Sequence, residues 1–317
     1  MVNITDVSRL ANVSKATVSR VLSGSRGVRE ESRLAVLQAA EQLNFRPNAT
    51  ARSLATQETN CVGIILSSQL GNRLASLLPL LEDALVRMGK SMLVRFADNA
   101  SQQQKTVDEL LGGRCDGVLV LNSKQPLNPD ERIVQLDGVS DSSNVNISYD
   151  LTFATESACR FLLGKGHRQI VLMLEDKSSP AGHSAIQGYQ QALQQQSIPI
   201  NTQLIMDSSE NQQALLGLLN SYQPFTAIVV QQDAQAADAM RLLREFNLAI
   251  PNDISIMSLE GTSLAEQLNP PLTCIEYPVE RLVQDSVHIL LAKNKFNMVE
   301  QKKYLGKLVV RESVVTR

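Results

Sequence analysis

Apolar residues at the start of the chain recur with helical spacing in three short stretches separated by turn-forming residues. The stretches predict helices at 4–10, 15–22 and 31–43, and the hydroxyl of Ser14 is placed to cap the second helix. We expect the third helix to direct these side chains into a small shared core: Leu34, Leu37, Ala40 and Leu43. Pro47 then interrupts the pattern, and residues 48–56 (NATARSLAT) form a short helix-capable stretch typical of a hinge.

A different pattern begins at Cys61, where short continuous apolar runs alternate with amphipathic stretches such as 74–88. The runs predict strands at 61–66, 91–94, 116–121, 169–174, 202–206, 226–230 and 254–257. The segment 144–150 leads into a helix predicted at 152–163, after which the pattern starts again. Because this alternation is typical of parallel sheets covered on both faces, we predict an α/β fold with two doubly wound lobes and a ligand cleft between them.

Composition narrows the class of protein. The 317 residues exceed what one compact core usually organises, and 43% apolar with 20% charged residues is ordinary globular composition. The four cysteines form no CxxC pair, so we predict neither a disulfide framework nor a metal site. The start MVNITDVSRL lacks the features of a signal peptide, and no run of about 18 apolar residues follows, so we expect a cytoplasmic protein with no membrane span.

Charge is divided unevenly along the chain. Residues 1–60 hold eight Lys and Arg against five Asp and Glu, a net charge of +3. Because the whole chain has a net charge of −2, the remaining residues carry −5. A basic head on an acidic body suits a nucleic-acid-binding module attached to a sensor.

The segment from Asp6 to Arg33 (DVSRLANVSKATVSRVLSGSRGVREESR) has the pattern of a helix-turn-helix. Its second helix carries small or polar residues on one side and Val18, Val21 and Leu22 on the other, so a slim polar face is left to enter a major groove. Arg20 has the fork that suits a guanine edge. The alternative is a solvated helix on a purely structural bundle, which this spacing alone leaves open.

The chain resembles the LacI/GalR family of bacterial transcription repressors. The match is close in TDVSRLANVSKATVSRVLSG and FRPNATARSLAT, and it continues through VGIIL, CDGVLVL, KGHRQIVLM, IQGYQQAL, IPNDISIMSLEG, NPPLTCIEYP and KLVVRESV. The resemblance implies a homodimer that binds near-palindromic double-stranded operator DNA and a small-molecule effector in the cleft. It also implies these domains: a helix-turn-helix domain at 1–46, a hinge at 47–60, and a two-lobed effector-binding and dimerisation domain at 61–317, with an N-lobe of about 61–149 and 278–305 and a C-lobe of about 150–277 and 306–317.

Carried over residue by residue, the resemblance implies base-reading roles for Lys15, Ala16 and Arg20 and phosphate contacts for Thr17 and Ser19. The remaining implied DNA contacts lie in the hinge: Asn48, Ala51, Leu54 and Ala55. Paired hinge helices are implied to lie in the minor groove, where Leu54 would wedge between base steps and kink the duplex. The alternative for Leu54 is an ordinary core leucine.

The implied effector site departs from the family pattern. The family's bidentate arginine position holds Ala185 here, and the polar pairs read Gln232 with Asp233, Glu260 with Gly261, and Asp137 with Gly138. The stretch from Leu121 to Asp137 is too short for the helix and strand that relatives place there. The predicted effector-lining residues are Ser67, Asn72, Asp137, Gln232 and Glu260, each with a solvated cleft residue as the alternative. His167 and His183 have no partner at catalytic spacing, which favours structural roles.

The function predicted from these observations is an effector-controlled repressor of carbohydrate uptake or catabolism genes. One alternative is the same DNA-binding role with a drifted pocket and an unusual effector or none. A stand-alone small-molecule binding protein is disfavoured by the attached head. An enzyme is disfavoured because no nucleophile and base pair, phosphate loop or metal motif stands out, and we predict no catalytic residue and no cofactor.

Overall fold

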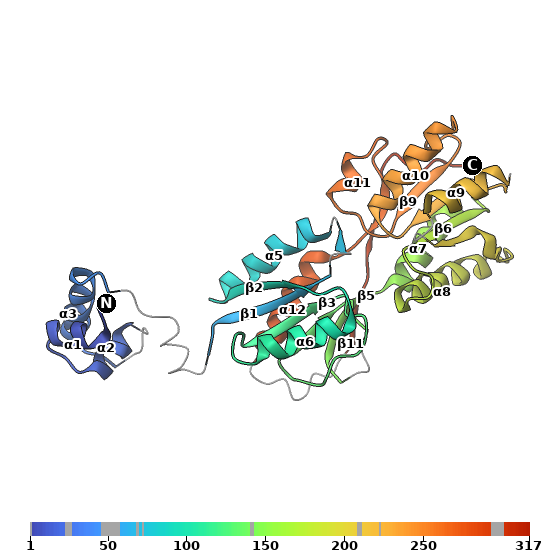
Figure 1. The fold of residues 1–317 in the computed structure, drawn as a ribbon. Helices are drawn as coiled ribbons and strands as arrows, with labels where there is room; N and C mark the ends of the chain where they lie inside the picture. The colour runs from blue at the N-terminus through green and yellow to red at the C-terminus, as the bar shows by residue number, and fades with distance from the viewer. Residues whose placement is uncertain are drawn as a thin grey trace. The chain divides into compact units, whose positions relative to one another are not determined.

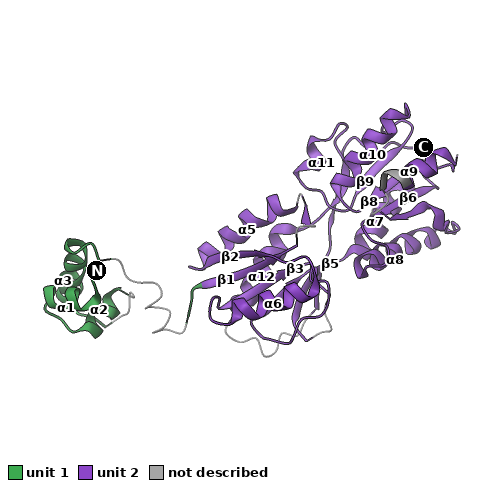
Figure 2. Cartoon of the chain, in the orientation of Figure 1, with its two compact units in different colours: residues 1–60 green, residues 61–317 purple. Residues whose placement is uncertain are grey.

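The computed structural model describes residues 2–22, 27–45, 58–67, 70–71, 73–139, 143–207, 211–221, 223–292 and 301–317, without the side chains of 211–213. The chain divides into two compact units, Met1–Asn60 and Cys61–Arg317 (Figure 2). We call the first unit the head and the second unit the body. Within the described residues, no helix is long and apolar enough to cross a membrane.

The described part of the head contains α1 (Ile4–Leu10), α2 (Lys15–Leu22) and α3 (Glu30–Gln42). Asn3 and Asp6 form a capping box at the start of α1. The predicted cap of α2 is present, because the Ser14 hydroxyl accepts the backbone N–H of Thr17 at 3.1 Å. The core consists of side chains from all of these helices: Val7, Val18, Val21, Val36, Ala39 and Ala40.

The predicted inward face of α3 was partly wrong. Leu34 and Leu37 are 53% and 48% exposed, whereas Val36 is fully buried. Apolar residues occupy two faces of this helix, and the periodicity does not decide between them. The face with Val36, Ala39 and Ala40 is inward because its small side chains match the valines of α1 and α2.

The N-lobe of the body is built on a six-stranded sheet with the order β11-β5-β4-β3-β1-β2. Its strands are β1 (Cys61–Leu66), β2 (Ser91–Phe96), β3 (Gly117–Leu121), β4 (Ile133–Leu136), β5 (Val145–Tyr149) and β11 (Gln301–Tyr304). All of the strand pairings in this sheet are parallel. Helices α5 (Arg73–Arg87) and α12 (Val279–Leu291) pack on one face, and α6 (Ala100–Leu111) packs on the other.

The C-lobe repeats this architecture with the order β12-β10-β9-β8-β6-β7. Its strands are β6 (Ile170–Leu174), β7 (Ile205–Asp207), β8 (Ala227–Val230), β9 (Ser255–Ser258), β10 (Thr273–Glu276) and β12 (Lys307–Val309), of which β12 is antiparallel to β10. Helices α7 (Leu151–Gly164) and α8 (Pro180–Gln195) cover one face. The other face packs against α9 (Asn211–Asn220), α10 (Asp233–Glu245) and α11 (Ser263–Gln267) (Figure 1).

The chain passes between the lobes after β5, after β10 and after β11. Both sheets were predicted, but the strands β4, β10, β11 and β12 were not. Thr202–Leu204, expected as the start of a strand, is a short 3-10 helix before β7. The stretch from Leu121 to Asp137 was predicted to be too short for both a helix and a strand; it contains the strand β4, and the fully described residues 122–132 contain no helix.

Candidate functional site

Helix α2 of the head presents a polar face to solvent. Lys15, Ala16, Ser19 and Arg20 of α2 are exposed, and Val18 and Val21 on the opposite side are buried in the core. Thr17 is half-buried, and its hydroxyl lies 2.9 Å from that of Ser14. The predicted hinge contacts fall outside the described residues: Asn48, Ala51, Leu54 and Ala55.

A cavity of about 780 Å³ lies between the two lobes of the body. Its wall includes residues from the carboxyl ends of strands in both sheets, which is where open α/β sheets place their ligands. The charged residues in its lining are Arg73, Lys124, Asp137, Asp150, Glu175, Asp176, Glu260 and Lys303. The volume is within the range of pockets that bind small molecules.

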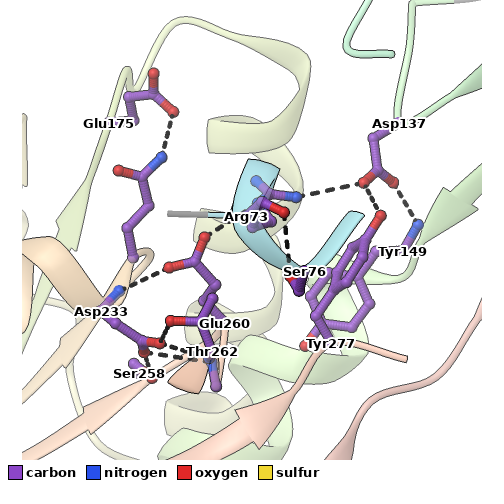
Figure 3. Close-up of polar contacts among 12 residues, drawn as sticks. Arg73, Ser76, Asp137, Tyr149, Glu175, Asp233, Ser258, Glu260, Thr262 and Tyr277 are labelled. Atoms are coloured by element: carbon purple, nitrogen blue, oxygen red, sulfur yellow. Dashed lines mark hydrogen bonds and ion pairs between the residues drawn. The ribbon is translucent and has the colours of Figure 1, made fainter. Parts of the chain in front are cut away.

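Arg73 projects into this cavity from the first residue of α5 (Figure 3). Its Nε lies 3.0 Å from Oε1 of Glu260, and its Nη1 lies 3.5 Å from Oδ2 of Asp137. The guanidinium carbon lies 5.1 Å from the ring centroid of Tyr277, within the range of a cation–π contact. Because Asp137 follows β4 and Glu260 follows β9, one side chain connects both lobes.

Asp137 is fixed from several sides. Its residue adopts a left-handed backbone conformation with φ 52°, which Asp tolerates better than most residues. Oδ1 accepts the backbone N–H of Tyr149 at 2.7 Å, and Oδ2 accepts the hydroxyl of Tyr277 at 2.6 Å. The two tyrosine rings meet edge to face with centroids 5.0 Å apart. These contacts hold the carboxylate toward Arg73 (Figure 3).

Gly138, which departs from the family pattern, is required by its surroundings. A Cβ at this position would collide with the hydroxyl of Ser123. That hydroxyl accepts the amide of Gln135 at 2.6 Å, and the same amide donates to the carbonyl of Val139 at 3.0 Å. A side chain at position 138 would therefore displace a buried hydrogen-bonded group.

Glu260 is only 5% exposed and is positioned by Asp233. Its Oε2 accepts the backbone N–H of Asp233 at 2.9 Å. The fully buried carboxylate of Asp233 accepts the hydroxyl of Ser258 at 2.5 Å and both the backbone N–H and the hydroxyl of Thr262, at 2.6 and 2.7 Å. Asp233 thus anchors the loop that carries Glu260 rather than facing the cavity (Figure 3).

Burial and the opposite charge act against each other at this ion pair. Burial raises the pKa of Glu260, although the Arg73 guanidinium and the backbone N–H of Asp233 pull it down. Burial also lowers the pKa of Arg73, but the electrostatic interactions with Glu260, Tyr277 and Asp137 have a larger combined effect. The pKa of Arg73 is therefore raised above its ordinary value. The guanidinium therefore stays charged, and the Glu260 carboxylate depends on it.

The other predicted lining residues lie elsewhere. Ser67 is fully buried, and its hydroxyl donates to Asp98 at 3.1 Å. Gln232 does not line the cavity, but its amide donates to Glu175, which does, at 3.2 Å. Asn72 falls outside the described residues. Ala185 is fully buried in the core that α7 and α8 share with the C-lobe sheet.

Arg73 was missed in the sequence, although one local signal was available. A cation at the first position of a helix faces the positive end of the helix dipole and is disfavoured there. An arginine in that position before a long apolar stripe indicates that acidic groups from elsewhere compensate it. The periodicity of the sequence does not identify which acidic residues contact Arg73.

Known protein families match both units. Residues 3–48 match the model of the bacterial regulatory proteins, lacI family, and residues 159–314 match the model of a periplasmic binding protein-like domain. The chain is 30% identical to the HTH-type transcriptional regulator GalR of Escherichia coli K12 over 306 residues, covering 92% of this chain and 89% of that protein. It is also 30% identical to the HTH-type transcriptional repressor PurR of Photorhabdus laumondii, over 99% of this chain and 97% of that protein.

A solved structure supports the same similarity over both units. The lac repressor dimer bound to operator and the anti-inducer ONPF superimposes with a TM-score of 0.85. Its identity to this chain is 25%, and the similarity covers 99% of each chain.

Proposed function

The chain belongs to the lacI family of bacterial regulatory proteins, and on that premise we propose that it represses transcription by binding an operator as a homodimer, with an affinity controlled by a small molecule in the cavity beside Arg73. The observation that carries this proposal is the combination, in one chain, of a helix-turn-helix head with a charged cavity between two lobes.

DNA reading is assigned to the exposed face of α2. Arg20 and Lys15 project from this face, and Val18 and Val21 anchor its back to the core, so the helix has the slim polar surface that a major groove admits. One such helix reads too few base pairs for useful specificity, which favours two heads on a near-palindrome. The operator-bound lac repressor of similar fold is likewise a dimer. We extend the DNA contacts to the hinge residues, with Leu54 as the wedge.

Effector binding is assigned to the cavity between the lobes. Asp137 and Glu260 line it and offer carboxylate oxygens, and Arg73 offers donors beside the aromatic face of Tyr277. Carbohydrate uptake or catabolism remains our proposed regulon. The absence of an arginine at position 185, where Ala185 is buried, keeps an unusual effector as the second candidate.

We place the protein in the cytoplasm, with its DNA target, and assign it no catalytic role and no cofactor. In the cavity, Arg73 forms ion pairs with Asp137 and Glu260, and this arrangement does not pair a nucleophile with a base.

The test is selection of duplexes from a random DNA library by the purified full chain, followed by footprinting. We expect an enriched near-palindrome with two protected half-sites, and light scattering that gives a dimer. A metabolite screen by thermal shift should then yield a compound that stabilises the body and alters operator affinity. Enrichment of no duplex, or footprinting of a symmetric site by a monomer, would contradict the proposal.

A further inference from the structure

The ion bridge at Arg73 crosses the proposed effector cavity. On one side the guanidinium meets Asp137 of the N-lobe, and on the other it meets Glu260 of the C-lobe, so this side chain forms ion pairs with both lobes. Arg73 itself lines the cavity, where it lies between Asp137 and Glu260 (Figure 3). Its side chain is 19% exposed. The bridge is therefore in the space that a ligand enters.

The bridge differs from the ion pairs on the surface of the body. Arg160 and Glu156, for example, are one turn apart on α7, 3.6 Å from each other, and Arg160 is 63% exposed. Such a pair contributes little to stability. Glu260, by contrast, is 5% exposed, and its carboxylate loses its counter-charge if the guanidinium leaves.

The charge of the cavity limits which ligands take the place of Arg73. Of the charged lining residues, Asp137, Asp150, Glu175, Asp176 and Glu260 outnumber the cations Arg73, Lys124 and Lys303. A neutral ligand that displaced the guanidinium would leave a buried carboxylate unpaired, and an anionic ligand would add a further negative charge. A ligand that carries its own positive charge avoids both penalties.

We propose that the Arg73 guanidinium is a built-in occupant of the effector site, which joins the two lobes through Asp137 and Glu260 until a small molecule carrying a positively charged amine or guanidine group replaces it at Glu260. This inference rests on the proposed function, because it treats the cavity as the site that controls operator binding. It assigns Arg73 a regulatory role and the effector a chemical class.

The stability test uses Arg73→Ala with ethylguanidinium, a probe that restores the missing cation, and with N-ethylurea, its neutral counterpart. We expect Arg73→Ala to have a lower Tm than the unmodified chain and ethylguanidinium at millimolar concentration to raise it saturably. N-ethylurea should not. The response should disappear in Arg73→Ala/Glu260→Gln, because that variant no longer has the unpaired carboxylate.

Arg160→Ala is the matched control, since it removes an arginine from an exposed ion pair and should respond to neither probe. Arg73→Lys keeps a positive charge, so its Tm should lie between that of the unmodified chain and that of Arg73→Gln. This comparison tests the proposal even if Arg73→Ala does not fold. In that case, a Tm for Arg73→Lys equal to that of Arg73→Gln would overturn the proposal. Equal responses to ethylguanidinium and N-ethylurea, or an equal response in the control, would also overturn it.

The regulatory part is tested by operator affinity without effector. We expect Arg73→Ala to change this affinity by about fivefold or more, the lower end of ordinary allosteric coupling, and ethylguanidinium to reverse the change. An unchanged affinity in a variant whose Tm responds to the probe would overturn the regulatory role. Failure of the unmodified chain to bind any operator would instead contradict the proposed function, while the Tm measurements would still decide whether a cation site exists.

Discussion

Arg73 and Glu260 meet across the cavity of the body, with Nε and Oε1 3.0 Å apart, although Arg73 begins α5 of the N-lobe and Glu260 follows β9 of the C-lobe. A contact between opposite lobes transmits any change in their separation directly to the residues that line the cavity. The arrangement of the lobes and the occupancy of the site are thereby linked through one pair of side chains.

The first prediction concerns base reading by α2. Arg20→Ala should weaken binding to the selected operator by about 1–3 kcal/mol and relax base preference, while binding to random DNA changes much less. Ser19→Ala, on the same exposed face, should weaken both alike, because phosphate contacts are independent of sequence. Fluorescence anisotropy with both duplexes measures the two affinities. An equal loss on both duplexes for Arg20→Ala would remove Arg20 from base readout.

The second prediction is that unmodified hexoses bind poorly. Each hexose hydroxyl buried without a partner costs about 1–3 kcal/mol, or about fivefold to 150-fold in affinity. Position 185 holds a buried alanine rather than a fork of donors, and the guanidinium of Arg73 already forms ion pairs with Asp137 and Glu260. Calorimetry with D-glucose and D-galactose measures this directly. Micromolar binding of either sugar, accompanied by release of operator DNA, would show that the substitutions are tolerated.

The third prediction separates the two cavity tyrosines. Tyr277→Phe removes a 2.6 Å hydrogen bond to the carboxylate of Asp137 and should lower the free energy of unfolding by about 1.5–3 kcal/mol. Tyr149→Phe is the control, because its hydroxyl donates at 3.2 Å to the neutral carbonyl of Ile275, and we expect a loss of about 0.5–1.5 kcal/mol. Urea unfolding gives both values, and the reverse order would contradict the assigned role of Asp137.

The fourth prediction is a pH dependence of stability that arises from His167. Its ring is fully buried; Nε2 donates to the carbonyl of Val315 at 3.0 Å, so Nδ1 accepts the hydroxyl of Thr226 at 2.9 Å, and both nitrogens are satisfied in the neutral form. Burial lowers the pKa of His167 below its ordinary value. The unfolded chain therefore takes up the proton first as the pH falls.

Stability from this group is fully present above about pH 6.5 and is lost below it, by at most about 1.4 kcal/mol per pH unit. Urea unfolding between pH 7.5 and pH 5.5 measures the slope. His167→Gln should flatten this slope. His183 and His288 are present in both proteins, so they cannot account for a difference between the two slopes. An identical slope in the variant would assign the pH dependence to other groups.

The sequence predicted those helices whose apolar residues recur over several turns and those strands that coincide with continuous apolar runs. The helices of the head and the central strands of both sheets follow from periodicity, as in β1 and β3. Periodicity did not resolve which side of α3 faces inward, because Val36 and Leu37 are adjacent apolar residues on different faces. Only the side chains of the other helices decide between them.

The sequence identified two residues of the candidate site but not the residue that connects them. Asp137 and Glu260 follow buried strands, and the structure places both in the cavity wall. The bridge between them depends on Arg73, which reaches them from a third element. Such a contact is long-range, and no local pattern in a single sequence encodes it.

The strands β11 and β12 are adjacent in the chain but complete different sheets. Neither sheet of the body is finished during synthesis until residues 301–309 have left the ribosome, whereas the helices of the head are made first. We therefore expect the body to fold late and cooperatively, with its earlier strands exposed to chaperones in the meantime. Expression of this protein should depend more on chaperone supply than its size alone suggests.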